Sequence, residues 1–305
     1  MPISTTFKAV LWMLGTVASL TTMAVSGREM SSELDTFEIM MYRSFIGVII
    51  VVVIGKLSGT FKSVSRQRFG LHLIRNISHF TAQNLWFYAL ALIPLAQVFA
   101  LEFSTPLWVA LFAPFFLGEK LTKVRIFTII LGFCGILIVA QPGNISLSSG
   151  VIAAALCAIG FAGSLVATKL LARTESITCI MFWLVTMQFV LGVVCAFYDG
   201  DVAIPSVNIL PLVFLIGVAG VFAHYCLTCA FKLAPILFIS PLDFLRLPII
   251  AIIGAVFYNE GINIWLIIGG AIIFGSNLLN LWVENKGVES KKSVQPRHSR
   301  DNVGE

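Results

Sequence analysis

The sequence predicts an all-α integral membrane protein in which ten transmembrane helices form two inverted five-helix repeats. The first observation is composition: of 305 residues, 58% are hydrophobic and only 11% are charged, whereas soluble proteins carry roughly 25% charged residues. The second is that the apolar segments are long enough to span a bilayer, which takes roughly 20 residues. The third is that the second half of the chain is similar in sequence to the first half.

Ten apolar segments of spanning length follow one another along the chain. The longest connection covers about residues 57–70, so no soluble domain is inserted between the spans. The predicted spans are 8–26, 37–56, 71–93, 95–118, 124–141, 150–172, 178–198, 209–232, 235–258 and 262–283.

The basic residues predict the orientation of these spans, because cytoplasmic connections of membrane proteins are rich in Lys and Arg. If the N-terminus is inside, seventeen of the 20 basic residues fall on the inner side, only Arg28 falls outside, and Arg43 and Arg246 lie within spans. We therefore expect both termini to be cytoplasmic. The net charge of +5 arises in these connections and does not indicate nucleic-acid binding. The polar tail 284–305 is expected to be cytoplasmic and disordered.

An internal repeat relates the two halves. The segment "ALALIPLAQVFALEFSTPLWVALFAPFFLGE" (89–119) returns 141 positions later as "AFKLAPILFISPLDFLRLPIIAIIGAVFYNE" (230–260), which places Asp243 at the position of Glu102. The earlier spans repeat at 145 positions, as in Gly47 and Gly192. Because each copy holds an odd number of spans, the second copy must enter the membrane from the opposite side.

The repeat divides the chain into a first half (1–143) and a second half (144–283), followed by the tail. Inverted repeats are a recurrent architecture of secondary transporters, which bind their substrate near the midplane between the halves.

Two segments carry a resemblance to a known family. "FFLGEKLTKVRIFTIILGFCGILIVAQPG" (115–143) and "PLDFLRLPIIAIIGAVFYNE" (241–260) resemble the EamA-type members of the drug/metabolite transporter superfamily, and the similarity extends over about residues 8–283. The resemblance implies alternating-access transport of a small metabolite, often an amino acid or a related compound. It does not identify the substrate.

Polar residues inside the spans are the candidate site, because a charge near the bilayer centre costs about 2.5–3.5 kcal/mol on insertion scales. Three polar pairs fall at equivalent positions of the repeat, which indicates a lined cavity rather than isolated packing residues. The predicted substrate-binding residues are Tyr42, Arg43, His79, Gln83, Trp86, Glu102, Gln188, His224, Asp243 and Arg246.

Specific roles follow for some of these residues. A pair such as Asp243 and Arg246, three residues apart, stabilises an exposed helix by only about 0.2–0.5 kcal/mol, so we expect it to be functional. Arg246 is expected to bind an anionic substrate group, because its planar fork suits a carboxylate, while Asp243 orients it. Glu102 and Arg43, at similar depths in the outer half, are expected to pair with each other.

Two further carboxylates, Glu119 and Glu260, stand at the ends of spans on opposite sides of the membrane. Gate contacts and helix-end contacts are both compatible with these positions. The pair Cys226 and Cys229 is interpreted as buried thiols, and no metal site or cofactor is expected, since a zinc site needs further ligands.

The resulting functional prediction is a secondary transporter of an amino acid or related zwitterionic or cationic compound, such as one like S-adenosylmethionine. No H-E-x-x-H, G-x-S-x-G or phosphate-binding glycine loop is present, so the sequence does not indicate an enzyme. An exporter of amino-acid derivatives or drugs is the alternative, followed by a channel or a membrane scaffold. The expected partners are the small-molecule substrate and the lipid bilayer of a bacterial inner membrane. A homodimer is left open.

Overall fold

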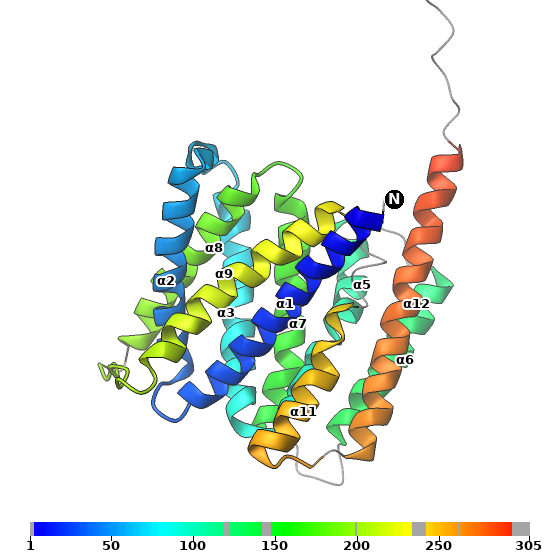
Figure 1. Cartoon of the computed structure of the whole chain (residues 1–305). Coiled ribbons are helices and arrows are strands. Elements are labelled where there is room, and N and C mark those ends of the chain that lie inside the picture. Colours follow the sequence, from blue (N-terminus) through cyan, green and yellow to red (C-terminus); the bar gives the residue numbers. More distant parts are fainter. Residues whose placement is uncertain are drawn as a thin grey trace, which may run out of the picture.

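The protein is a bundle of long helices (Figure 1). The computed structural model describes residues 3–118, 122–141, 148–198, 200–233, 242–261 and 263–294, and within these ranges it contains helices and connections but no strand. The first half holds α1 (Ile3–Met30), α2 (Thr36–Leu57), the 3₁₀ helix η1 (Thr60–Ser63), α3 (Phe69–Leu92), α4 (Leu95–Glu102), α5 (Thr105–Phe116) and α6 (Lys123–Ala140). The second half holds α7 (Ser149–Leu171), α8 (Ile177–Ala196), α9 (Leu210–Leu233), α11 (Arg246–Tyr258) and α12 (Ile264–Val294).

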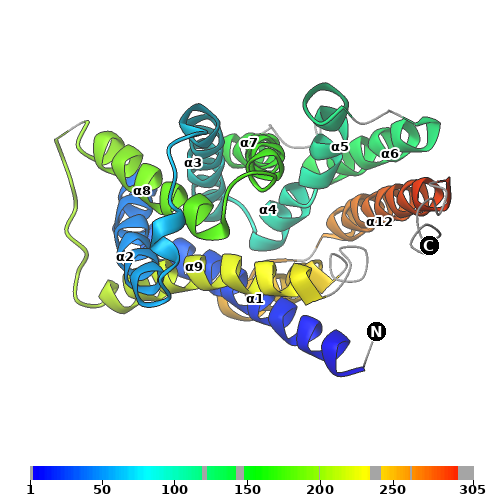
Figure 2. The ribbon, with the colours of Figure 1, turned by 90° about the horizontal axis from the view of Figure 1, so that it is seen from above.

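Helices of one half pack mainly on helices of the other half. The most extensive contacts join α3 with α7, α1 with α9, α6 with α12 and α2 with α8, followed by α2 with α9, α5 with α7 and α4 with α11. Figure 2 shows α3 and α7 on one side of the bundle and α1 and α9 on the other. Exchanging the halves turns the α1–α9 pair into the α7–α3 pair and leaves the α2–α8 pair unchanged. This is the packing expected of two repeats related by a pseudo-two-fold axis.

The chain is a multi-pass integral membrane protein. Within the described ranges, seven helical segments are long and apolar enough to cross a bilayer, and Arg246–Tyr258 and Ile264–Asn280 are shorter apolar helices. The predicted span 71–93 corresponds to α3, which is not among the seven. Helix α3 contains several polar residues, including His72, Arg75 and Asn76, and these lower its mean hydropathy. Their side chains are buried inside the bundle.

The predicted span 95–118 is not one continuous helix. It is broken between α4, which ends at Glu102, and α5, which begins at Thr105. Pro106 lacks the N–H that would continue the ladder, and the Thr105 hydroxyl donates to the Glu102 carbonyl at 2.6 Å. In the second half, α11 begins at Arg246, 141 positions after Thr105. The start of the predicted span 235–258 lies outside the described residues.

The predicted tail begins within the last described helix. Helix α12 continues to Val294, past the predicted start of the tail at 284. Glu and Lys, which are frequent there, are good helix formers, so the loss of hydrophobicity does not end the helix. Residues 295–305 lie outside the described part.

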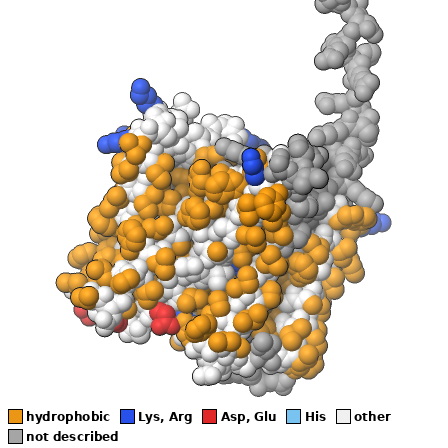
Figure 3. All heavy atoms as spheres, in the orientation of Figure 1, with side chains coloured by type: hydrophobic (Ala, Val, Ile, Leu, Met, Phe, Trp, Pro, Cys, Tyr) orange, Lys and Arg blue, Asp and Glu red, His pale blue; other side chains and the backbone are white. Residues whose placement is uncertain are grey.

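Charge is distributed unevenly over the two ends of the bundle. On the face shown in Figure 3, Lys and Arg gather at the end where the N-terminus and the end of α12 lie, and Asp and Glu at the other end. Hydrophobic side chains cover the surface between them. The apolar band is the surface that faces lipid.

Candidate functional site

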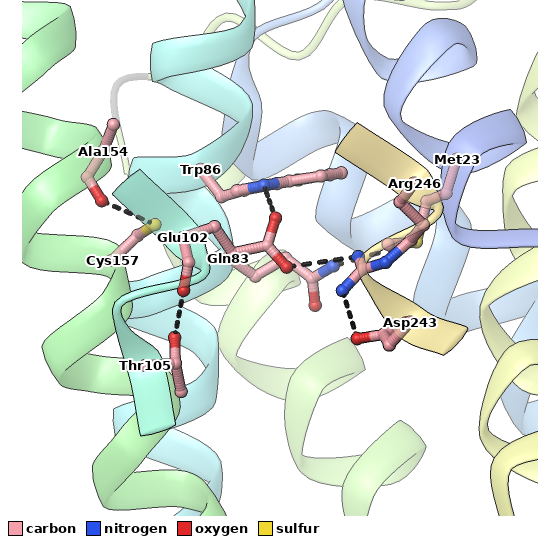
Figure 4. A network of polar contacts seen from close by, with 9 residues as sticks. All are labelled: Met23, Gln83, Trp86, Glu102, Thr105, Ala154, Cys157, Asp243 and Arg246. Atoms are coloured by element: carbon pink, nitrogen blue, oxygen red, sulfur yellow. Dashed lines mark hydrogen bonds and ion pairs between the residues drawn. The ribbon is translucent and has the colours of Figure 1, made fainter. Parts of the chain in front are cut away.

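Three charged side chains meet where the two halves join, and we call Glu102, Asp243 and Arg246 the ion triad. The Arg246 Nη2 donates to Asp243 Oδ2 at 2.7 Å, and its Nη1 donates to Glu102 Oε1 at 3.2 Å. The second oxygen of Glu102 accepts from Trp86 Nε1 at 2.8 Å. Figure 4 shows Trp86 and Arg246 reaching Glu102 from different sides. One guanidinium of the second half therefore joins carboxylates from both halves.

The helix breaks place these groups. Glu102 is the last residue of α4 and Arg246 is the first residue of α11. A negative charge is unfavourable at a helix C-terminus and a positive charge is unfavourable at an N-terminus, because of the helix dipole. Each charge is thus poorly placed on its own helix, and the ion pair between them offsets this cost.

Aromatic rings surround the guanidinium. The carbon at the centre of the Arg246 guanidinium lies 4.9 Å from the ring centroid of Phe103 and 5.5 Å from that of Phe99, within the range of a cation–π interaction. Phe103 in turn contacts Phe244. Asp243 is the most accessible member of the triad: its side chain is 29% exposed, whereas that of Glu102 is 14% and that of Arg246 is 6% exposed.

The predicted pair of Glu102 with Arg43 is wrong, because Glu102 binds Arg246 instead. Arg43 on α2 donates to the sulfur of Met23 at 3.8 Å, and Gln83 on α3 donates to the same sulfur at 3.8 Å. The binding of an anionic substrate group by Arg246 stays a prediction. Both terminal nitrogens of Arg246 bind carboxylates, and only its Nε lacks a hydrogen-bond partner among the described residues.

Four of the remaining predicted residues lie in a second group together with Arg75. We call this group the basic cluster: Arg43, Arg75, His79, Gln188 and His224. Nε2 of Gln188 lies 3.1 Å from Nδ1 of His79, and the rings of His79 and His224 have centroids 6.2 Å apart. A small cavity between α2, α8 and α9 is lined by Arg43 and His224 together with Gly217 and Gly220.

Arg75 is the residue of this cluster that sequence reasoning missed. It was counted with the inner basic residues near the start of a span, yet it is only 4% exposed. Its Nε donates to Thr168 Oγ1 at 2.9 Å and its Nη1 to Asn76 Oδ1 at 3.1 Å. The available signal was its position four residues before His79, which places both side chains on one face of α3.

Tyr42 does not join either group. Its hydroxyl donates to the Ala203 carbonyl at 2.9 Å, and its ring lines a separate apolar cavity beside Phe45, Phe189 and Phe197. We find no contact in the described residues that brings it to the ion triad.

Glu260 lies at the acidic end of the bundle. It accepts from the backbone N–H of Leu95, at the start of α4, at 2.8 Å, and it pairs with Arg28 at 2.5 Å. The guanidinium of Arg28 also stacks on Tyr258 at 4.8 Å. Glu260 therefore fastens α1, α4 and the end of α11 together. Glu119, its counterpart, lies outside the described residues.

One group of side chains has donors compatible with a metal ion, although no metal site was expected. Ligand atoms of His72, Glu175 and Cys179 all lie within 4.8 Å of one another. The thiol of Cys179 is also engaged with the backbone of Ser65, whose N–H donates to the sulfur at 3.3 Å.

Comparison with known proteins gives one family and several relatives. The EamA-like transporter family matches residues 7–141 and 148–282. A riboflavin transporter of Brucella anthropi is 34% identical over 223 residues, covering 71% of this chain and 78% of the relative. An S-adenosylmethionine uptake transporter of Rickettsia prowazekii is 25% identical over 299 residues, covering 96% and 99%. The pseudopaline exporter CntI of Pseudomonas aeruginosa is 26% identical over 265 residues, covering 86% and 92%.

A solved crystal structure also matches, with a TM-score of 0.65 at 20% identity, covering 91% of this chain and 98% of the solved chain. At this identity the likeness shows the fold alone.

Proposed function

The chain belongs to the EamA-like transporter family and is a transporter of a small metabolite, and we propose that its cargo is a positively charged or zwitterionic compound of the S-adenosylmethionine kind. The observation that carries this proposal is the composition of the ion triad. Two carboxyl groups, Glu102 and Asp243, share the single guanidinium of Arg246. With both carboxyls ionised, the triad has an excess negative charge that an organic cation can neutralise.

The triad also offers a free acceptor for such a cation. Oδ1 of Asp243 is buried and has no hydrogen-bond partner in the part of the chain that the structure describes. An ammonium donor of the cargo can bind there. Aromatic rings favour organic cations, and Phe244 follows Asp243 directly and packs on Phe103 and Phe274.

The names of the relatives support a small organic cargo but differ in its charge. Riboflavin carries no charge at neutral pH, and a site with several buried ionised side chains would lose hydration of those charges without compensation on binding it. S-adenosylmethionine carries positive and negative groups and suits the triad better. Because one relative is an uptake protein and another an exporter, we leave the direction of transport open.

We further propose that residues 1–143 and 144–283 act as the two moving repeats of an alternating-access cycle, in a bacterial inner membrane with both termini cytoplasmic. The basic end of the bundle supports this orientation, since Lys and Arg concentrate on cytoplasmic connections. Glu260 and Arg28 would hold the acidic end closed, because they fasten helices of both halves.

The test is counterflow in liposomes that contain the purified chain. Radiolabelled S-adenosylmethionine should enter saturably, and faster when the liposomes are preloaded with the unlabelled compound, as expected of a carrier and not of a channel. Empty liposomes and the Asp243→Asn variant serve as controls, and riboflavin is measured in parallel. Entry of riboflavin without entry of S-adenosylmethionine would refute the proposed cargo.

A further inference from the structure

We propose that Arg43 and Arg75 form an anion subsite that takes the carboxylate of the cargo, at the opposite end of the transport site from the ion triad. This subsite belongs to the proposed transport function, and it rests on the proposal that the cargo passes through this part of the bundle. The two guanidinium groups, those of Arg43 and Arg75, are not part of the ion triad.

Both guanidiniums are buried, and neither has an acidic partner among the residues that the structure describes. Arg43 is 7% and Arg75 is 4% exposed, and within the described ranges neither forms an ion pair with a carboxylate. Arg43 contacts the sulfur of Met23, and Arg75 contacts the neutral oxygens of Thr168 and Asn76. By contrast, Arg246 binds two carboxylates and Arg28 binds one.

A buried unpaired charge is costly, and removing a charge partner typically destabilises a protein by several kcal/mol. Arginine cannot escape this cost by losing its proton, because it stays protonated in proteins. Two such residues close to one pair of histidines therefore indicate that the compensating anion is supplied from outside the chain.

The cavity beside Arg43 has a volume of about 10 Å³, which is the space of a single water molecule, so neighbouring side chains must move apart for a carboxylate to bind. Within the described residues, no carboxylate contacts either arginine. A Cβ atom added at Gly220 would lie 3.8 Å from the guanidinium carbon of Arg43, an ordinary van der Waals distance, so this glycine packs close beside the guanidinium. On the other side, Arg75 stands one turn of α3 before His79. The ring of His79 lies beside that of His224, and His224 lines the small cavity together with Arg43.

Two glutamine side chains with unpaired oxygens link this subsite to the triad. Oε1 of Gln83 and Oε1 of Gln188 are buried and lack a hydrogen-bond partner among the described side chains and backbone; the two residues are 3% and 0% exposed. Gln83 shares the sulfur of Met23 with Arg43, and Figure 4 shows Gln83 and Met23 beside Glu102 and Arg246. A zwitterion can thus place its cationic group at the triad and its carboxylate at Arg43 and Arg75.

The experiment uses the smallest carboxylate as its probe, so that it does not depend on the identity of the cargo. Thermal unfolding of the purified chain is followed in sodium acetate, in sodium chloride at equal ionic strength, and in acetamide. Acetate that occupies the subsite should raise the Tm of the wild type by about 2 °C over chloride, because a ligand of the folded state stabilises it by mass action. Acetamide should not.

The variants Arg43→Gln and Arg75→Gln should lose the acetate shift without a lower Tm in chloride, since each removes an unpaired buried charge. Arg66→Gln changes an exposed arginine and should keep the shift. If a glutamine variant fails to fold, Arg43→Lys and Arg75→Lys test the subsite instead. These variants keep the positive charge but lose the planar guanidinium, so the Tm shift in acetate should be at least halved.

An acetate shift that is absent in the wild type, or equal in the wild type and in the arginine variants, would overturn the subsite. The result is independent of the counterflow experiment. Loss of S-adenosylmethionine transport with an intact acetate shift refutes only the proposed cargo, and the reverse pattern refutes only the anion subsite.

Discussion

The rings of Phe103 and Phe244 lie 4.6 Å apart, and the two residues occupy equivalent positions in the repeats, 141 residues apart. Contact between equivalent residues occurs only close to the axis that relates the two halves. Contacts between α6 and α12 follow the same symmetry. Ser276 lies beside Gly132, together with Leu107, and Ile273 lies beside Gly135; Gly132 is equivalent to Ile273, and Gly135 to Ser276. The pseudo-two-fold axis therefore passes close to the ion triad.

The symmetry is broken at one position of the triad. Glu102 and Asp243 are equivalent, but the counterpart of Arg246 is Thr105, which caps its own helix break. One cation consequently serves two equivalent carboxylates. The fold shared by the two halves does not require an arginine at this position, since the other half has a threonine there. For this reason we assign the triad to binding of the cargo.

The contact between α6 and α12 yields a stability prediction. A Cβ atom on Gly269 would lie 2.8 Å from the carbonyl oxygen of Gly135, a backbone atom that cannot move aside. We expect Gly269→Ala to destabilise the protein by about 1–3 kcal/mol, as overpacking of a dense interior does. Thermal unfolding in detergent measures the effect.

Gly275 on the same helix is the matched control, because no atom lies within 4 Å of a Cβ atom built there. Gly275→Ala should be neutral or raise stability by up to about 1 kcal/mol, since alanine is the better helix former. Equal effects of the two substitutions would mean that the helices do not pack through Gly269.

The repeat itself was readable from the sequence, for a local reason. Prolines and charged residues are rare within apolar spans, so they stand out when the two halves are aligned. Alignment of the chain with itself was therefore enough to make Glu102 equivalent to Asp243. The structure places both side chains on Arg246, and starts α5 and α11 at equivalent positions.

Partners across helices were not readable in the same way. Depth along a span suggested Arg43 for Glu102, but depth does not say how a helix is rotated or which helix is its neighbour. Counting of basic residues likewise assigned Arg75 to the inner side of the membrane without showing that its guanidinium turns into the bundle. The wrong pairing of Glu102 and the omission of Arg75 from the candidate site both concern packing, which the sequence pattern does not encode directly.

The orientation can be tested by labelling single cysteines from outside intact cells with a reagent that does not cross the membrane. We expect a cysteine at Ser148, which precedes α7, to be labelled. Cysteines at Lys62 and Lys292 should react only after permeabilisation, because Lys and Arg mark the cytoplasmic side. The wild-type chain sets the background of its six native cysteines. Labelling of position 148 only after permeabilisation would reverse the proposed topology.

Removal of one carboxylate charge tests the excess negative charge of the triad. Glu102→Gln preserves the size of the side chain and its acceptor for Trp86, but it leaves Arg246 and Asp243 as a neutral pair. We expect the half-saturation concentration for a cationic cargo to rise roughly tenfold or more, the effect of losing about 1.5–3 kcal/mol of charged hydrogen bonding. Uptake into liposomes at varied concentration measures it.

The control for this substitution is Glu33→Gln. Glu33 accepts from the hydroxyl of Ser206 at 3.0 Å in an exposed contact at the acidic end, far in sequence from the triad, and its loss should leave uptake unchanged. An unaltered half-saturation concentration in Glu102→Gln would show that the negative charge does not attract the cargo.

The last prediction concerns the cation that holds the triad together. Arg246→Ala leaves Glu102 and Asp243 without their shared partner, and breaking a buried ion pair in this way costs about 3–5 kcal/mol. Adding Asp243→Asn should recover part of the lost stability, and adding Glu102→Gln as well should recover most of it, because each step removes one uncompensated charge. Thermal unfolding of the single, double and triple variants gives this order. Uptake should remain lost throughout the series, since the charges that hold the cargo are gone. A triple variant that transports at the wild-type rate would show that the triad only stabilises the join between the halves, and that the cargo binds elsewhere.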